Sequence, residues 1–130
     1  MIAFVKTLRW IVRLSALALV VLGIGFWTGN WMNLIPVHMT LGIVLVICFW
    51  ITALAALSVR APVGMVIAAL VLGAIVLALG ATQMRLLPGP AHWVVQVVHL
   101  LIGLGAAGFN ERISRLIEWK GSGTMAATSH

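Results

Sequence analysis

Long apolar runs separated by short polar connectors dominate this chain. Residues 14–59, 61–84 and 86–110 contain no Lys, Arg, Asp or Glu. About 20 apolar residues in a helix cross the hydrocarbon layer of a membrane. The first run is therefore long enough for two spanning helices, and each of the others for one. Because a helix satisfies its own backbone hydrogen bonds in lipid, the pattern predicts an all-α fold, an integral membrane four-helix bundle.

The connectors between the apolar runs set the expected spans. We expect spanning helices at about residues 8–27, 36–58, 63–81 and 91–109, which together form one domain over residues 1–110. Pro36 and Pro62 suit the starts of the second and third spans, since the first turn of a helix does not use the missing N–H. The amphipathic segment 111–120 is predicted to lie along the membrane surface as a short helix. Residues 121–130 are small and polar, and we expect them to be disordered.

Composition and charge support the membrane interpretation. Hydrophobic residues make up 63% of the chain and charged residues 8%, whereas a soluble domain has about 25% charged residues. The net charge of +6 does not indicate nucleic acid, because the basic residues flank the spans and form no stripe. Arg85 lies on one side of the predicted membrane, and the other side holds Lys6, Arg9, Arg13, Arg60, Arg112, Arg115 and Lys120. This bias predicts that both termini are cytoplasmic, in what we expect to be a bacterial inner membrane.

A short motif occurs twice in otherwise apolar spans. His38 follows a valine and precedes Gly42 by four residues, and His99 has the same relation to a valine and to Gly103. Residues four apart share one face of a helix. Each imidazole is therefore expected to lie beside a gap that a flat group can enter.

The fourth predicted span also carries a polar stripe. Steps of four, three and four residues place its members on one helix face, and these are His92, Gln96, His99 and Gly103. Ionisable groups within a span usually face the interior of the bundle. Two imidazoles on facing helices can hold a haem through its iron. We therefore expect haem b as the cofactor, with the glycines leaving room for its ring and Gln96 lining the same site.

The pairing of the ligands has two solutions. His38 pairs with either His99 or His92 of the last span. The repeated motif and its glycine favour His99, whereas depth counted from the outer ends of the helices favours His92. We favour His38 and His99 as the iron ligands, with His92 at the outer edge contacting a haem propionate, and His92 is the alternative ligand.

These runs resemble those of small four-helix membrane b-type cytochromes. The Val-His-x-x-x-Gly run at His38 and the run Gln96-Val-Val-His99 are similar to the cytochrome b561 type and to the four-helix half-domains of haem A synthase. The resemblance implies a four-helix bundle that binds haem and transfers electrons. The cytochrome b561 pattern has more histidines, including some on the first helix, and often two haems. Residues 8–27 contain no histidine, so we expect one haem.

The sequence thus predicts a redox membrane protein that passes electrons between a quinol or a periplasmic donor and a partner protein. The alternative is a haem-free accessory subunit of a larger membrane complex, in which the histidines only form polar caps or interhelical hydrogen bonds. A quinone site or another metal site is a third interpretation. A proton-coupled exporter is disfavoured, because it needs an acidic residue within a span. Small residues along residues 63–81, including Gly73 and Gly80, predict a packing helix without chemistry, and a homodimer or a place in a larger complex.

Overall fold

The computed structural model describes the backbone of residues 1–127 and the side chains of residues 1–123. Its long helices are α1 (Ile2–Trp27), α2 (Ile35–Ala55), α3 (Val63–Thr82) and α4 (His92–Ala127). Short 3-10 turns extend the connections at Met32–Leu34, Ala56–Val59 and Gln83–Arg85. All four helices are long and apolar enough to cross a membrane. Within the described residues, the predicted four-helix architecture is confirmed.

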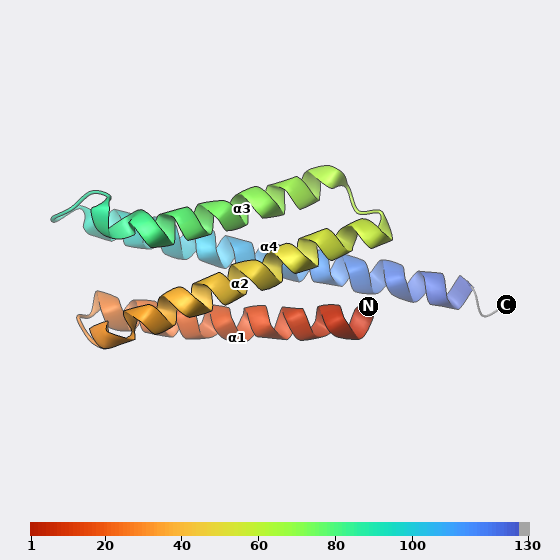
Figure 1. Ribbon diagram of the computed structural model, residues 1–130, viewed down its shortest axis with the longest axis horizontal. Helices are drawn as coiled ribbons and strands as arrows, with labels where there is room; N and C mark the ends of the chain where they lie inside the picture. The colour runs from red at the N-terminus through yellow and green to blue at the C-terminus, as the bar shows by residue number, and fades with distance from the viewer. Residues whose placement is uncertain (128–130) are drawn as a thin grey trace.

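The helices run up and down beside one another (Figure 1). Consecutive helices pack together, α1 also packs on α4, and α2 contacts α4 across the bundle. The chain termini and the α2–α3 connection lie at one end of the bundle, which we call the terminal end. The α1–α2 and α3–α4 connections lie at the other end, which we call the loop end.

The connections follow the expected turn chemistry. Pro36 lies in the first turn of α2, and Pro62 is the residue that caps the start of α3. Between α2 and α3, Arg60 has a left-handed backbone conformation with φ of 54°. This conformation allows the chain to reverse its direction within the short connection. In the α3–α4 connection, Gly89 has φ of 96°, a conformation that glycine adopts without steric strain.

Two helix boundaries differ from the sequence prediction. Helix α1 begins at Ile2 and not near residue 8, so its basic residues lie within the helix. Helix α4 continues without a break from His92 to Ala127, where a separate surface helix at 111–120 and a disordered tail at 121–130 were expected. The reason is packing, because Ile113 and Ile117 are completely buried in the bundle. Residues 128–130 lie outside the described part of the chain.

Ion pairs hold the terminal halves of α1 and α4 together. Arg13 donates two hydrogen bonds to Glu111, at 3.0 Å from Nε to Oε2 and 2.7 Å from Nη2 to Oε1. Arg9 pairs with Glu118 at 3.0 Å, and Arg115 donates to Glu111 at 2.8 Å. Two parallel bonds between a guanidinium and a carboxylate restrict geometry strongly. The only two acidic residues of the chain therefore both face the basic side of α1.

The core is concentrated in the terminal half of the bundle. The largest fully buried side chains come from residues 5–12 of α1, residues 46–52 of α2 and residues 110–117 of α4; they are Phe49, Ile113, Ile117, Val5, Val12, Val46, Asn110, Thr52 and Ser114. Among the described side chains, none of this set lies in the loop half. The helices therefore pack tightly at one end and leave the other end less filled.

One close contact between α2 and α3 provides a test of this packing. The indole of Trp50 lies against Gly73 and donates a hydrogen bond from Nε1 to the Leu70 carbonyl at 3.2 Å. A Cβ at position 73 would overlap the indole ring. We expect Gly73→Ala to lower stability by about 1–3 kcal/mol, the usual cost of overpacking, as measured by thermal unfolding in detergent.

The matched control is Gly64→Ala on the same helix, where an added Cβ meets no atom within 4 Å. Both substitutions replace glycine by alanine in one helix, Gly64 in its first turn and Gly73 in its middle. A loss of stability in Gly73→Ala alone therefore indicates the clash with Trp50. Equal unfolding temperatures for the two variants would show that the Trp50 contact is absent in the membrane protein.

Candidate functional site

The two repeated-motif histidines meet inside the loop half of the bundle. His38 lies in the first turns of α2 and His99 lies two turns into α4. Their ring centres are 6.5 Å apart, with 47° between the ring planes. The structure therefore brings together the pair that the motif repeat favoured.

His92 takes a different position. Its Nδ1 lies 3.2 Å from the carbonyl oxygen of Leu86 in the α3–α4 connection. This contact fixes the first residue of α4 to the preceding loop. Gln96 lies between the two histidines of α4 in sequence and is half-buried. His92 thus lies at the loop end, and the described ring contacts of His38 are with Phe26 and His99.

Neither ring of the central pair has a hydrogen-bond partner. The Nδ1 atoms of His38 and His99 are both buried, and no described residue donates to them or accepts from them. Burying a polar atom without a partner costs about 1–3 kcal/mol. An interhelical hydrogen bond at Nδ1 does not explain these residues, because no such bond is formed. The contacts of the described residues therefore leave the Nδ1 atoms of these two half-buried imidazoles without a structural role.

Residues from the other two helices flank the pair. The ring of Phe26 on α1 meets His38 edge to face, with centres 5.4 Å apart. On α3, a Cβ built on Gly80 would lie 3.4 Å from Cε1 of His99. Each of the four helices therefore contributes one residue at this level: Phe26, His38, Gly80 and His99.

Gly80 was not among the predicted site residues. The sequence pattern marked it only as one of several small packing residues. A signal was present, since Gly80 lies about one turn from the loop end of its helix, a depth similar to that of His38. Only the arrangement of the helices shows that it faces His99.

The predicted glycine gaps are open. A Cβ added to Gly42 or to Gly103 would meet no atom within 4 Å, and both residues are half-buried. Neither contacts an imidazole ring, so the glycine that touches a ring is Gly80. The space beside Gly42 and Gly103 is nevertheless available one turn from each histidine.

The ring centres of the pair have the separation that one iron held between two imidazoles would need. With about 2.0 Å between a metal and a histidine nitrogen and about 1.2 Å from that nitrogen to the ring centre, opposed ligand rings have centres about 6.4 Å apart. The observed separation is 6.5 Å. Among the described residues, no group of three His, Cys, Asp or Glu side chains can hold a metal ion. A haem needs only two protein ligands, because the porphyrin supplies the other four.

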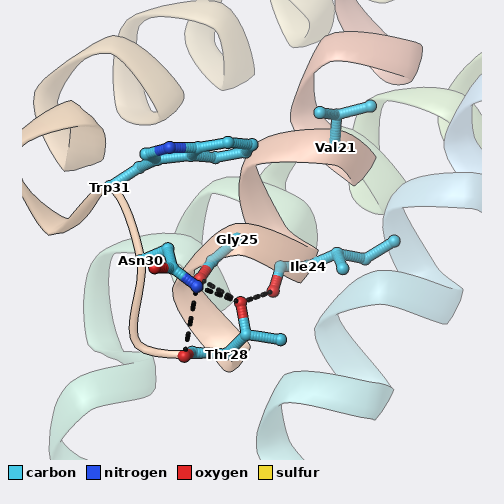
Figure 2. Close-up of a pocket in the computed structure, with 6 residues that line it drawn as sticks. All are labelled: Val21, Ile24, Gly25, Thr28, Asn30 and Trp31. Atoms are coloured by element: carbon cyan, nitrogen blue, oxygen red, sulfur yellow. Dashed lines mark hydrogen bonds between the residues drawn. The ribbon is translucent and has the colours of Figure 1, made fainter.

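A shallow groove of about 240 Å³ lies near the site, where the α1–α2 connection folds back on α1. Figure 2 shows the Trp31 indole lying over the helix at Gly25, with Asn30 and Thr28 below it. The Asn30 amide donates to the Thr28 hydroxyl at 3.0 Å, and Gly25 is buried under the indole. The groove has no ionisable lining residue. The packing of Trp31 on Gly25 and the hydrogen bond between Asn30 and Thr28 hold the connection between α1 and α2 in place.

No protein-family model, no curated protein and no solved structure matches this chain. The interpretation of the site rests on its own geometry.

Proposed function

We propose that this chain is a membrane-embedded b-type haem protein with His38 and His99 as the two iron ligands. The observation that carries the proposal is the half-buried imidazole pair, with ring centres 6.5 Å apart and with buried Nδ1 atoms that have no hydrogen-bond partner among the described residues. A bound haem would supply one-electron redox chemistry. The proposed function is electron transfer between a quinol or periplasmic donor and a partner protein.

The residues around the pair have separable roles in this proposal. Helices α2 and α4 position one ligand each, because they contact each other across the bundle. Phe26 restricts the orientation of the His38 ring, and Gly80 leaves room for the His99 ring. Among the described residues, the loop half has no fully buried large side chain that the proposed group would have to displace.

The charge distribution supports an orientation for the proposed protein. Basic residues gather at the terminal end, which the positive-inside rule places in the cytoplasm. The loop end with the histidine pair would then lie near the outer face of a bacterial inner membrane. Both termini would be cytoplasmic, and a donor on the periplasmic side or in the outer leaflet would reach the haem over a short distance.

A haem-free accessory subunit is the second candidate, and one observation favours it. Exposed glycines on α3 and α4, at Gly64, Gly105 and Gly108, have open space where a Cβ would stand. Small residues let helices approach closely in lipid. A second copy of the chain or a larger membrane complex could pack there, and such packing is compatible with either function.

Substitution of the histidines tests the haem proposal. The purified protein should be red, with a Soret band that shifts on reduction. We expect His38→Ala and His99→Ala to lower haem content at least about tenfold, because each removes an axial ligand. The matched control His92→Ala should retain haem, with at most a change in potential. Absorption spectra of proteins produced with ample haem give the answer.

Two outcomes would contradict parts of this proposal. Loss of haem in His92→Ala with retention in His99→Ala would transfer the ligand role to His92. A colourless, iron-free protein would reject the cytochrome proposal and leave the accessory-subunit candidate.

Glycine substitutions test access of the ring separately from ligation. Gly80→Leu should lower haem occupancy, because the added side chain would displace the His99 ring. Gly42→Leu and Gly103→Leu should also lower it, by filling the space beside the ligands. Gly108→Leu is the control, since this exposed glycine lies on α4 more than two turns from His99, toward the terminal end. Haem-to-protein ratios should separate the four variants, and equal occupancy in all of them would exclude a ring at these positions.

Reporter fusions test the orientation. A fluorescent protein fused to either terminus should fold in the cytoplasm, and alkaline phosphatase inserted after Gly89 should be active in the periplasm. The reason is the basic residues at the terminal end. Active phosphatase at the C-terminus would reverse the orientation, and with it the side on which the haem lies.

A further inference from the structure

A second hollow lies at the terminal end of the bundle, far from the histidines. It has a volume of about 520 Å³ and lies between the start of α3 and the terminal half of α4; its lining residues are Pro62, Met65, Arg112, Arg115, Leu116 and Lys120. Three of these side chains are basic and three are apolar. No acidic residue lines it.

The arrangement of charges on α4 produces this asymmetry. Glu111 and Glu118 face α1, where Arg13 and Arg9 pair with them. Arg112 lies on another face of the helix, and no carboxylate among the described residues is within ion-pair distance of its guanidinium. Arg112 therefore brings to the groove a positive charge that no carboxylate of the described residues pairs with.

The two other basic residues are held in place around the groove. Arg115 donates through Nε to Glu111 at 2.8 Å. Lys120 lies with Nζ 3.3 Å from the carbonyl oxygens of both Val59 and Arg60 in the α2–α3 connection. These contacts thus hold Arg115 and Lys120 in defined positions on the basic side of the groove.

The apolar side of the groove lies where α3 begins. Pro62 caps that helix, and Met65 and Leu116 are half-buried. In a membrane this level is the boundary between headgroups and acyl chains. Basic pockets between spanning helices at such a boundary recognise anionic lipid headgroups.

We propose that this groove binds one anionic phospholipid, with its phosphate at Arg112, Arg115 and Lys120 and the start of an acyl chain against Met65 and Leu116. A soluble phosphate would use the basic side only, and the apolar half of the lining favours a lipid. The site depends on insertion of the protein in a membrane and is independent of the haem.

Native mass spectrometry of the full chain in neutral detergent, titrated with phosphatidylglycerol or phosphatidylcholine, tests this site. The protein should retain one phosphatidylglycerol selectively. Arg112→Gln should weaken that binding about five-fold, the usual effect of one basic residue at an anionic surface. Arg112→Glu should weaken it further, with unchanged thermal stability, because Arg112 is exposed and no carboxylate of the described residues pairs with it.

Lys6→Glu is the matched control, since Lys6 is an exposed basic residue at the same end on α1. Lys6→Glu should leave phosphatidylglycerol binding unchanged. An equal loss of binding in Lys6→Glu and Arg112→Glu would show that the lipid is attracted by the overall positive charge and not by this groove, and it would overturn the proposal. Met65→Trp, which fills the groove and keeps every charge, should also reduce binding. Full displacement of the lipid by inorganic phosphate, or equal retention of both lipids, would contradict a phospholipid site.

Discussion

The packing of α1 against the terminal half of α4 holds this bundle together. Val5 and Val12 of α1 lie completely buried beside a core that includes Ile113 and Ile117 of α4. Arg13 and Glu111 then fix the register of the two helices through a bidentate ion pair. Pairing with a guanidinium lowers the cost of keeping a half-buried carboxylate charged. Both carboxylates of the chain, Glu111 and Glu118, form such pairs with arginines of α1.

The loop half of the bundle has few fully buried side chains, because the core lies in the terminal half. Because the terminal half supplies the core, the loop half tolerates two imidazoles without hydrogen-bond partners and glycines with open space beside them. Such a region contributes little to the stability of the fold. The Trp31 indole over Gly25 keeps the α1–α2 connection in place there. We infer a division of the bundle into a half that stabilises the fold and a half that holds the histidine pair.

Local patterns in the sequence predicted much of this arrangement, and long-range contacts account for what was missed. Uncharged runs predicted the four helices, and the repeated His-to-Gly spacing pointed to His38 and His99. Counting depth from helix ends suggested His92, but His92 instead contacts the Leu86 carbonyl at the loop end. Gly80 and the Arg13–Glu111 pair were missed because each depends on a neighbouring helix far away in sequence. The amphipathic pattern of residues 111–120 predicted a surface helix, whereas these residues continue α4. Such a pattern shows that one face of a helix is apolar, but not whether that face lies on a membrane or on α1.

Electron paramagnetic resonance of the oxidised, purified protein tests the central claim most directly, because it reports the ligands of the iron. Two imidazoles on one haem predict a low-spin ferric signal, with one haem per chain by pigment analysis. A high-spin ferric signal would mean that one of the two histidines does not bind the iron. A protein that takes up no haem would contradict the account that the 6.5 Å pair of His38 and His99 is a haem site.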